Sequence, residues 1–225
     1  MRYNFITIEG NIGTGKTTLA SKIANDLNAK LILEQFEDNA FLPKFYEDPV
    51  KYAFPLELSF LAERYQQLKD QLSEQDLFKE FTISDYSIQK SLLFASITLA
   101  NDEYQLFSKL FNIINLQLPK PDLFIYLYLD IEKTRSNIQA RGRKYEMEIQ
   151  ESYLADVQKG YFQYMKQQSE QRILIIDVND VDFVNNKAHY NTIVELLDND
   201  YAPGINRASI IESNPKAKSN KEILI

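Results

Sequence analysis

The chain has 225 residues with 44% hydrophobic and 25% charged residues, values typical of a folded globular protein. Its formal net charge of -7 argues against a nucleic-acid partner, because a phosphate backbone requires a basic surface. The absence of cysteine excludes disulfides and thiolate chemistry, and a single histidine, His189, excludes a histidine metal cluster.

In the first half of the chain, short runs of β-branched and aromatic residues predict strands at residues 3–9, 30–33 and 81–84. A helical pattern begins at Thr17, and a long helix is predicted over residues 56–74. The intervening residues 38–52 carry Pro43 and Pro49 and are predicted to form a loop.

The second half predicts helices after Asp85 and over residues 102–116, the latter ending before Pro119 and Pro121. Two further strands are predicted at residues 122–129 and 173–178, and further helices at residues 131–140, 151–168 and 188–197.

This alternation predicts an α/β protein with a five-stranded parallel sheet and helices on both faces. We find no internal repeat, so residues 1–201 are expected to form a single domain. From about residue 202 the composition shifts to Ser, Asn, Lys and Pro, which predicts a flexible tail for residues 202–225, or alternatively a strap across a partner subunit.

A phosphate-binding loop follows the first predicted strand. The segment Gly10-Asn11-Ile12-Gly13-Thr14-Gly15-Lys16-Thr17 fits the P-loop pattern G-x-x-x-x-G-K-[ST] without a mismatch, and Thr18 adjoins it. Glycines let backbone N–H groups point at phosphate oxygens, and the helix that follows directs its positive end at the same charge. Lys16 is predicted to reach the β and γ phosphates and Thr17 to ligate Mg²⁺, so the expected fold is that of a P-loop NTPase.

The residues around this loop resemble the deoxynucleoside kinase family, from the first strand to about Met165. The resemblance rests on Asn11-Ile12-Gly13 within the P-loop, on residues 46–64, and on Arg141-Gly142-Arg143 followed by Glu146. It implies a kinase of nucleotide salvage that transfers the γ-phosphate of ATP to the 5′-hydroxyl of a deoxynucleoside.

The resemblance also assigns roles to individual residues. Glu34 takes the place of the catalytic carboxylate, Arg64 of an arginine near the sugar 5′ position, and Arg141 and Arg143 of the lid that clamps the phosphates. The remaining roles are sugar 3′-hydroxyl binding by Tyr46 and Glu146, and Mg²⁺ binding by Thr17 and Asp85.

Each role has a plainer alternative. Glu34 can be a solvated surface carboxylate, and the lid arginines can be cations at a helix end. Asp85 can cap a helix, a role that does not exclude metal binding.

Two positions depart from the family pattern. Tyr86 stands where the family usually has arginine, and tyrosine cannot replace a cation. Glu57 stands where a glutamine usually reads the base edge, with Lys90 near the second base-reading position. A carboxylate with an ammonium would complement the donors and acceptor of guanine, which favours a guanine-type base. Alternatively, Glu57 and Lys90 pair with each other.

Two other functions stay open from the sequence. A nucleoside monophosphate kinase similar to thymidylate kinase would share the fold, although the absence of arginine at Tyr86 counts against it. A nucleotide-binding switch without efficient turnover is the second.

The N-terminus lacks an apolar targeting segment and no stretch approaches the roughly 20 apolar residues of a membrane span, so we expect a cytoplasmic protein without a membrane partner. The resemblance implies a homodimer packed through helices such as those around residues 56–72 and 102–116.

Overall fold

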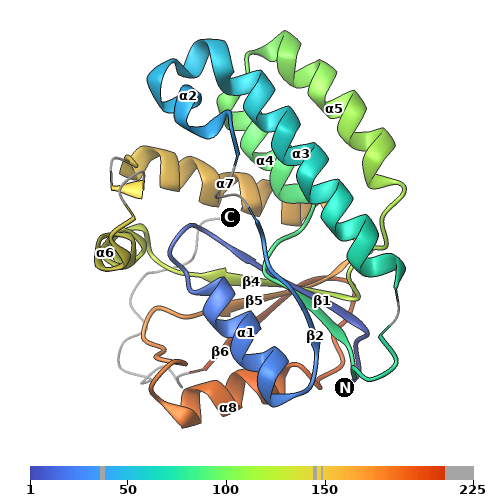
Figure 1. The fold of residues 1–225 in the computed structure, drawn as a ribbon. Coiled ribbons are helices and arrows are strands. Elements are labelled where there is room, and N and C mark those ends of the chain that lie inside the picture. The colour runs from blue at the N-terminus through green and yellow to red at the C-terminus, as the bar shows by residue number, and fades with distance from the viewer. Residues whose placement is uncertain (36–38, 75, 144–145, 148, 211–225) are drawn as a thin grey trace.

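The strands join into one parallel six-stranded sheet of order β2-β3-β1-β4-β5-β6 (Figure 1). The structure is a computed structural model that describes residues 1–35, 39–74, 76–143, 146–147 and 149–210, apart from the side chain of Tyr46. The strands are β1 (Phe5–Gly10), β2 (Lys30–Ile32), β3 (Thr82–Ser84), β4 (Leu123–Tyr128), β5 (Arg172–Asp177) and β6 (Gly204–Ser209).

Helices cover both faces of the sheet. Two of them, α1 (Lys16–Asp26) and α8 (Lys187–Leu196), lie on one face (Figure 1). The other face carries α3 (Pro49–Ser73), α4 (Gln89–Thr98), α5 (Asn101–Asn115) and α7 (Glu151–Gln167) (Figure 1). The short helix α2 (Leu42–Glu47) precedes α3, and α6 (Ile131–Arg141) follows β4.

Strand β4 shows why the sheet needs both layers. Its side chains alternate between the faces, with Ile125 and Leu127 packed in the cluster under α1 and α8, and Phe124 and Tyr126 packed in the cluster against α7. All four are fully buried, as expected for a strand of a parallel sheet that is covered on both sides. The α/β fold is thereby confirmed, and each predicted strand and helix is present.

The prediction of a loop over residues 38–52 was wrong for most of that segment. Pro43 and Pro49 lie in the first turns of α2 and α3, where the missing N–H of proline costs no helical hydrogen bond. Asp48 caps α3, because its carboxylate accepts a hydrogen bond of 3.2 Å from the backbone N–H of Lys51. The helix α3 therefore begins at Pro49, before the predicted start at residue 56, and it continues through Pro55.

The sheet has one strand more than predicted. Residues 204–209, assigned to the tail, form β6 and pair in parallel with β5 from Arg172 to Asp177. The prediction missed β6 because its sequence, GINRAS, is partly exposed and lacks a run of apolar residues. The rest of the predicted tail, residues 211–225, lies outside the described residues. None of the described helices is both long enough and apolar enough to cross a membrane.

Candidate active site

The P-loop connects the end of β1 to the start of α1. Gly10 has a φ of 154°, and a Cβ there would lie 2.8 Å from the carbonyl oxygen of Leu127. Gly15, at the N-cap of α1, has a φ of 85°, and a Cβ there would lie 2.7 Å from the ring of Phe183. Only glycine fits both the backbone conformation and the space at these positions.

Side chains from other elements hold the loop in place. The amide of Asn11 donates to the carbonyl of Leu154 on α7 at 2.7 Å, and that of Asn137 on α6 donates to the carbonyl of Gly13 at 2.9 Å. Lys16 donates to the carbonyl of Asn11 at 2.8 Å. Burial, with the positive charge of Lys90 nearby, lowers the pKa of Lys16 to about 8. The P-loop is therefore held in position by other elements, and the Lys16 ammonium is placed to bind an anion.

Glu34, just beyond β2, lies between two cations. The Arg64 Nη2 atom lies 2.8 Å from Glu34 Oε1, and Lys90 Nζ lies 2.5 Å from Glu34 Oε2. The Glu34 side chain is only 10% exposed. Burial alone would raise its pKa, but the charges of Lys90 and Arg64 outweigh burial and hold the pKa at about 2. Glu34 is therefore a fixed, ionised carboxylate and not a solvated surface residue.

Asp85 follows β3 and connects the P-loop to Glu34. Its Oδ2 atom accepts a hydrogen bond of 2.5 Å from the Thr17 hydroxyl, and its Oδ1 atom accepts one of 2.8 Å from the backbone N–H of Glu34. A hydroxyl and a carboxylate side by side at a P-loop are the hard oxygen donors that Mg²⁺ prefers. Thr17 and Asp85 therefore fit a Mg²⁺ that keeps water and phosphate as its other ligands.

Glu57 on α3 is a buried carboxylate in a different setting. It is 3% exposed, and its Oε1 atom accepts a hydrogen bond of 2.9 Å from the Thr98 hydroxyl. Its Oε2 atom has no hydrogen-bond partner in the part of the chain that the structure describes. Burial raises its pKa to about 7, against the opposing charge of Arg64 and the bond from Thr98. A buried, unpartnered oxygen of this kind indicates a site for a ligand.

The segment after α6 brings the predicted lid residues together. Arg141 and Arg143 each place a guanidinium nitrogen near Glu146 Oε1, at 3.7 and 3.4 Å. Glu146 is buried, and its Oε2 atom has no hydrogen-bond partner among the described residues. Two arginines therefore lie beside a carboxylate that can still accept a hydrogen bond.

One cavity of about 1440 Å³ joins these groups. Its walls include Lys16 and Thr17 of the P-loop and most of the other predicted site residues, namely Glu34, Glu57, Arg64, Asp85, Lys90, Arg141, Arg143 and Glu146. Aromatic rings of Phe45, Phe60, Phe94 and Tyr153 complete the walls. Within the P-loop, Ile12 and Gly13 also line the cavity.

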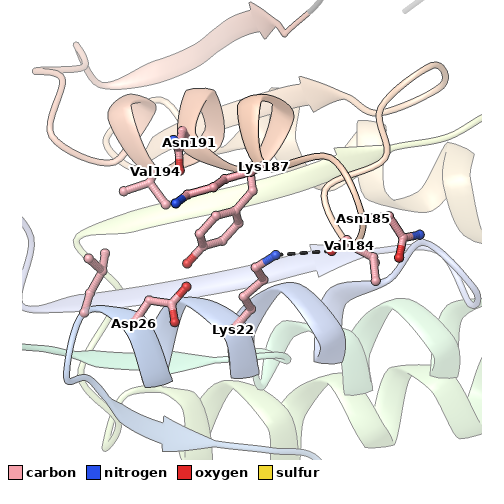
Figure 2. A pocket seen from close by; sticks show the side chains of 9 residues that line it. Lys22, Asp26, Val184, Asn185, Lys187, Asn191 and Val194 are labelled. Carbon is pink, nitrogen blue, oxygen red and sulfur yellow. Dashed lines mark hydrogen bonds between the residues drawn. The ribbon is translucent and has the colours of Figure 1, made fainter.

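A second cavity of about 390 Å³ lies between α1 and α8, on the opposite face of the sheet (Figure 2). Lys22 crosses it and donates to the carbonyls of Phe183 and Val184 at 3.2 and 3.3 Å. This contact holds the loop whose Phe183 ring packs at Gly15. The described residues that line this second cavity include none of the predicted site residues.

The structure bears on three further positions. Lys90 forms its ion pair with Glu34, so the alternative in which Glu57 and Lys90 pair with each other is wrong. Both residues line the cavity, and base reading by Lys90 stays a prediction. Tyr86 is fully buried, and its hydroxyl donates to Gln67 at 2.6 Å. The side chain of Tyr46 lies outside the described residues.

Sequence reasoning missed Ser91 and Thr98. Ser91 accepts a hydrogen bond of 2.8 Å from Arg64, and Thr98 donates to Glu57. A signal was present for Thr98, because Lys90, Phe94 and Thr98 recur every four residues and therefore share one face of α4. All three line the cavity.

Comparison with known proteins gives consistent matches. The family model described as deoxynucleoside kinase matches residues 6–201. The deoxyguanosine kinase of Bacillus subtilis (strain 168) is 37% identical over 194 residues, which cover 84% of this chain and 93% of that protein. The deoxyadenosine/deoxycytidine kinase of the same organism is 29% identical over 221 residues, 95% of each chain. A structure of deoxyadenosine kinase from M. mycoides with bound dATP has a TM-score of 0.74 and 25% identity, covering 87% of this chain and 100% of that one.

Proposed function

The chain belongs to the deoxynucleoside kinase family, and from this premise we propose that it transfers the γ-phosphate of ATP to the 5′-hydroxyl of a deoxynucleoside. The observation that carries the proposal is the position of Glu34. Its carboxylate, held by Arg64 and Lys90, lines the same cavity as Lys16 of the P-loop. A donor phosphate on the P-loop and an acceptor hydroxyl on Glu34 would thus share one enclosed space.

Glu34 acts chiefly by orientation. With a pKa of about 2, it is a weak proton acceptor but a permanent hydrogen-bond acceptor at neutral pH. The hydroxyl oxygen would point at the phosphate while its proton points at Glu34, which takes the proton as transfer completes. Lys90 supplies a cation beside the acceptor, and this accounts for the absence of arginine at Tyr86.

Thr17 and Asp85 are the residues that would hold Mg²⁺. When bound, Mg²⁺ neutralises charge on the β and γ phosphates. Lys16 would bind the same phosphates from the P-loop, and Arg141 and Arg143 would bind them from the lid and exclude water.

The sugar and base would occupy the rest of the cavity. The free Oε2 atom of Glu146 can accept a hydrogen bond from the sugar 3′-hydroxyl, a role that it would share with Tyr46. The Glu57 carboxylate, as an acceptor, favours the two adjacent donors of guanine. The 37% identity to a deoxyguanosine kinase supports the same base preference.

We further propose that the enzyme is a cytoplasmic homodimer of nucleotide salvage, with α5 in the subunit interface. Leu106 and Ile113 lie two turns apart on α5 and are 52% and 61% exposed, and Leu116 at its C-cap is 86% exposed. Apolar side chains gathered in this way are typical of an interaction surface. Sedimentation of the wild type and of Ile113→Glu tests this, and a wild-type monomer would contradict it.

The function is tested by measuring ADP release with ATP and Mg²⁺, offering each deoxynucleoside and each nucleoside monophosphate in turn. We expect stimulation by deoxynucleosides, with the guanine nucleoside preferred, and loss of both nucleotide binding and activity in Lys16→Ala. Stimulation by monophosphates alone would indicate a monophosphate kinase. Tight ATP binding without stimulation by any acceptor would indicate a switch.

A further inference from the structure

Glu57 differs from Glu34 and Glu146 in the charges beside it. Glu34 contacts Arg64 and Lys90, and Glu146 lies near Arg141 and Arg143, whereas no described cation lies within ion-pair distance of Glu57. Within the described part of the chain, the Thr98 hydroxyl bonds to Glu57 Oε1, and the buried Oε2 atom has no partner. Ionising a buried carboxylate without a counterion is costly, so burial favours the protonated form of Glu57.

The charges around Glu57 come from few elements. On its own helix, Arg64 opposes protonation, and on α4 so does Lys90, but both cations are bonded to Glu34. Of the other elements packed on α3, α2 contributes Leu42 and Phe45 to the described cavity wall and α5 contributes none. The more distant titratable groups on the wall are Lys16, Glu63, Asp70, Asp85, Arg141, Arg143, Glu146 and Tyr153.

The two protonation states of Glu57 present different hydrogen-bonding patterns to a ligand. As a carboxylate, it offers two acceptors, which match the N1–H and 2-amino donors of guanine. As a carboxylic acid protonated on Oε2, it offers one donor beside one acceptor, which match N1 and the 6-amino group of adenine and also O6 and N1–H of guanine. With a pKa of about 7, Glu57 populates both states near neutral pH.

We propose that Glu57 reads the base in both protonation states, so that the carboxylate selects guanine and excludes adenine, whereas the carboxylic acid accepts either purine. The inference rests on the proposed function, and it adds that base preference is set by pH. The enzyme would then be a purine deoxynucleoside kinase whose selectivity changes without any movement of the backbone. The carboxylate facing adenine N1 leaves two acceptors opposite each other, which costs enough to discriminate.

The test is internal competition. Deoxyguanosine and deoxyadenosine are supplied together with ATP and Mg²⁺, and the ratio of the two monophosphate products is measured from about pH 6 to about pH 8. We expect the guanine-to-adenine ratio to rise with pH and to approach roughly a tenfold rise per pH unit above pH 7, because the fraction of the acid form, which alone accepts adenine, falls by that factor. A ratio that stays constant over this range, with both nucleosides phosphorylated, overturns the inference and leaves the proposed function intact.

Two controls make the result specific to Glu57. In Glu57→Gln the amide always offers one donor and one acceptor, which fit either purine, so we expect a ratio that does not depend on pH and a larger share of adenine product than the wild type gives at about pH 8. In Glu63→Gln, on the same helix, the ratio should depend on pH as in the wild type. Equal pH dependence in Glu57→Gln and the wild type would contradict the inference.

A third substrate and a binding measurement keep the test independent of variants and of turnover. Deoxyinosine lacks the 2-amino donor, so its competition with deoxyguanosine in the wild type should become less favourable as pH rises. Dissociation constants of deoxyguanosine and deoxyadenosine, measured without ATP, should show the same pH-dependent ratio. If they do and no phosphate is transferred, the base-reading inference stands and the proposed function fails.

Discussion

Two buried carboxylates in the wall of one cavity have opposite electrostatic surroundings. Glu34 contacts both Arg64 and Lys90, and its pKa lies at about 2. Glu57 has a single hydroxyl partner among the described residues, and its pKa lies at about 7. Both residues are glutamates in the wall of one cavity. The difference teaches that the placement of two cations, and not burial itself, decides whether an acid is permanently charged or can change its charge.

The two glutamates therefore affect folding in opposite directions as pH changes. The pKa of Glu34 is lower in the folded protein than its ordinary value of 4.5, so its stabilisation is present above that value and is lost as pH falls towards 2. The pKa of Glu57 is higher than 4.5 in the folded protein, so ionising it destabilises the fold as pH rises from 4.5 through about 7. Each of the following variants tests one side of this contrast.

The largest effect is expected from Glu34→Gln. The amide cannot take the hydroxyl proton and leaves Arg64 and Lys90 without their carboxylate, so kcat should fall by roughly 10²–10⁴ while ATP affinity is retained. Steady-state kinetics and equilibrium ATP titration measure the two quantities. A parallel loss of ATP affinity would show that Glu34 supports the whole cavity and not the acceptor alone, and Glu63→Gln serves as the matched control.

The next effect concerns stability, in Glu57→Gln. Because the amide is never ionised, the variant should be more stable than the wild type by up to about 3 kcal/mol above pH 7, and by much less near pH 4.5. Urea unfolding at the two pH values gives the free energies. The same gain at both pH values would mean that charge on Glu57 is not the cause.

A smaller change in rate is expected from Lys90→Met. Removing a charge-assisted hydrogen bond to Glu34 should lower kcat roughly 10- to 100-fold and raise the pKa of Glu34. The acidic limb of the kcat profile should therefore move to higher pH, and Lys90→Arg should restore it. If Lys90→Met changed the base preference and left this limb unmoved, Lys90 would read the base together with Glu57 and would not act on Glu34.

The smallest effect is expected from Tyr86→Phe. The hydroxyl of Tyr86 bonds to Gln67 and not to Glu34, so its loss should cost about 1 kcal/mol of unfolding free energy and leave kcat unchanged. Urea unfolding and steady-state kinetics check both statements. A large fall in kcat would indicate that the Tyr86 hydroxyl acts on Glu34 or on the acceptor hydroxyl.

The contrast between Glu34 and Glu57 also shows which parts of the site could be predicted from the sequence. The P-loop is a continuous local pattern, and Glu34 and Asp85 follow strands whose carboxyl ends meet at one edge of the sheet, so all three could be placed from residue order. The contact of Lys90 with Glu34 could not, because it depends on how α4 is rotated against β2. The same holds for the lack of a cation at Glu57.

The fold was predictable wherever apolar runs were long and unbroken. The two prolines of residues 38–52 indicated a loop, yet both lie in the first turns of helices, where proline is acceptable. Strand β6 lies at the sheet edge, where partial exposure removes the apolar pattern that would have identified it.

The central place of β1 in the sheet has a consequence for the order in which the protein folds. β1 is the first strand to be synthesised, but its partners are β3, which begins at Thr82, and β4, which begins at Leu123. Gly10 also needs the backbone at Leu127 beside it. The P-loop therefore cannot reach its native conformation until more than half of the chain has been synthesised. A ribosome-bound fragment that ends before β4 should not bind ATP.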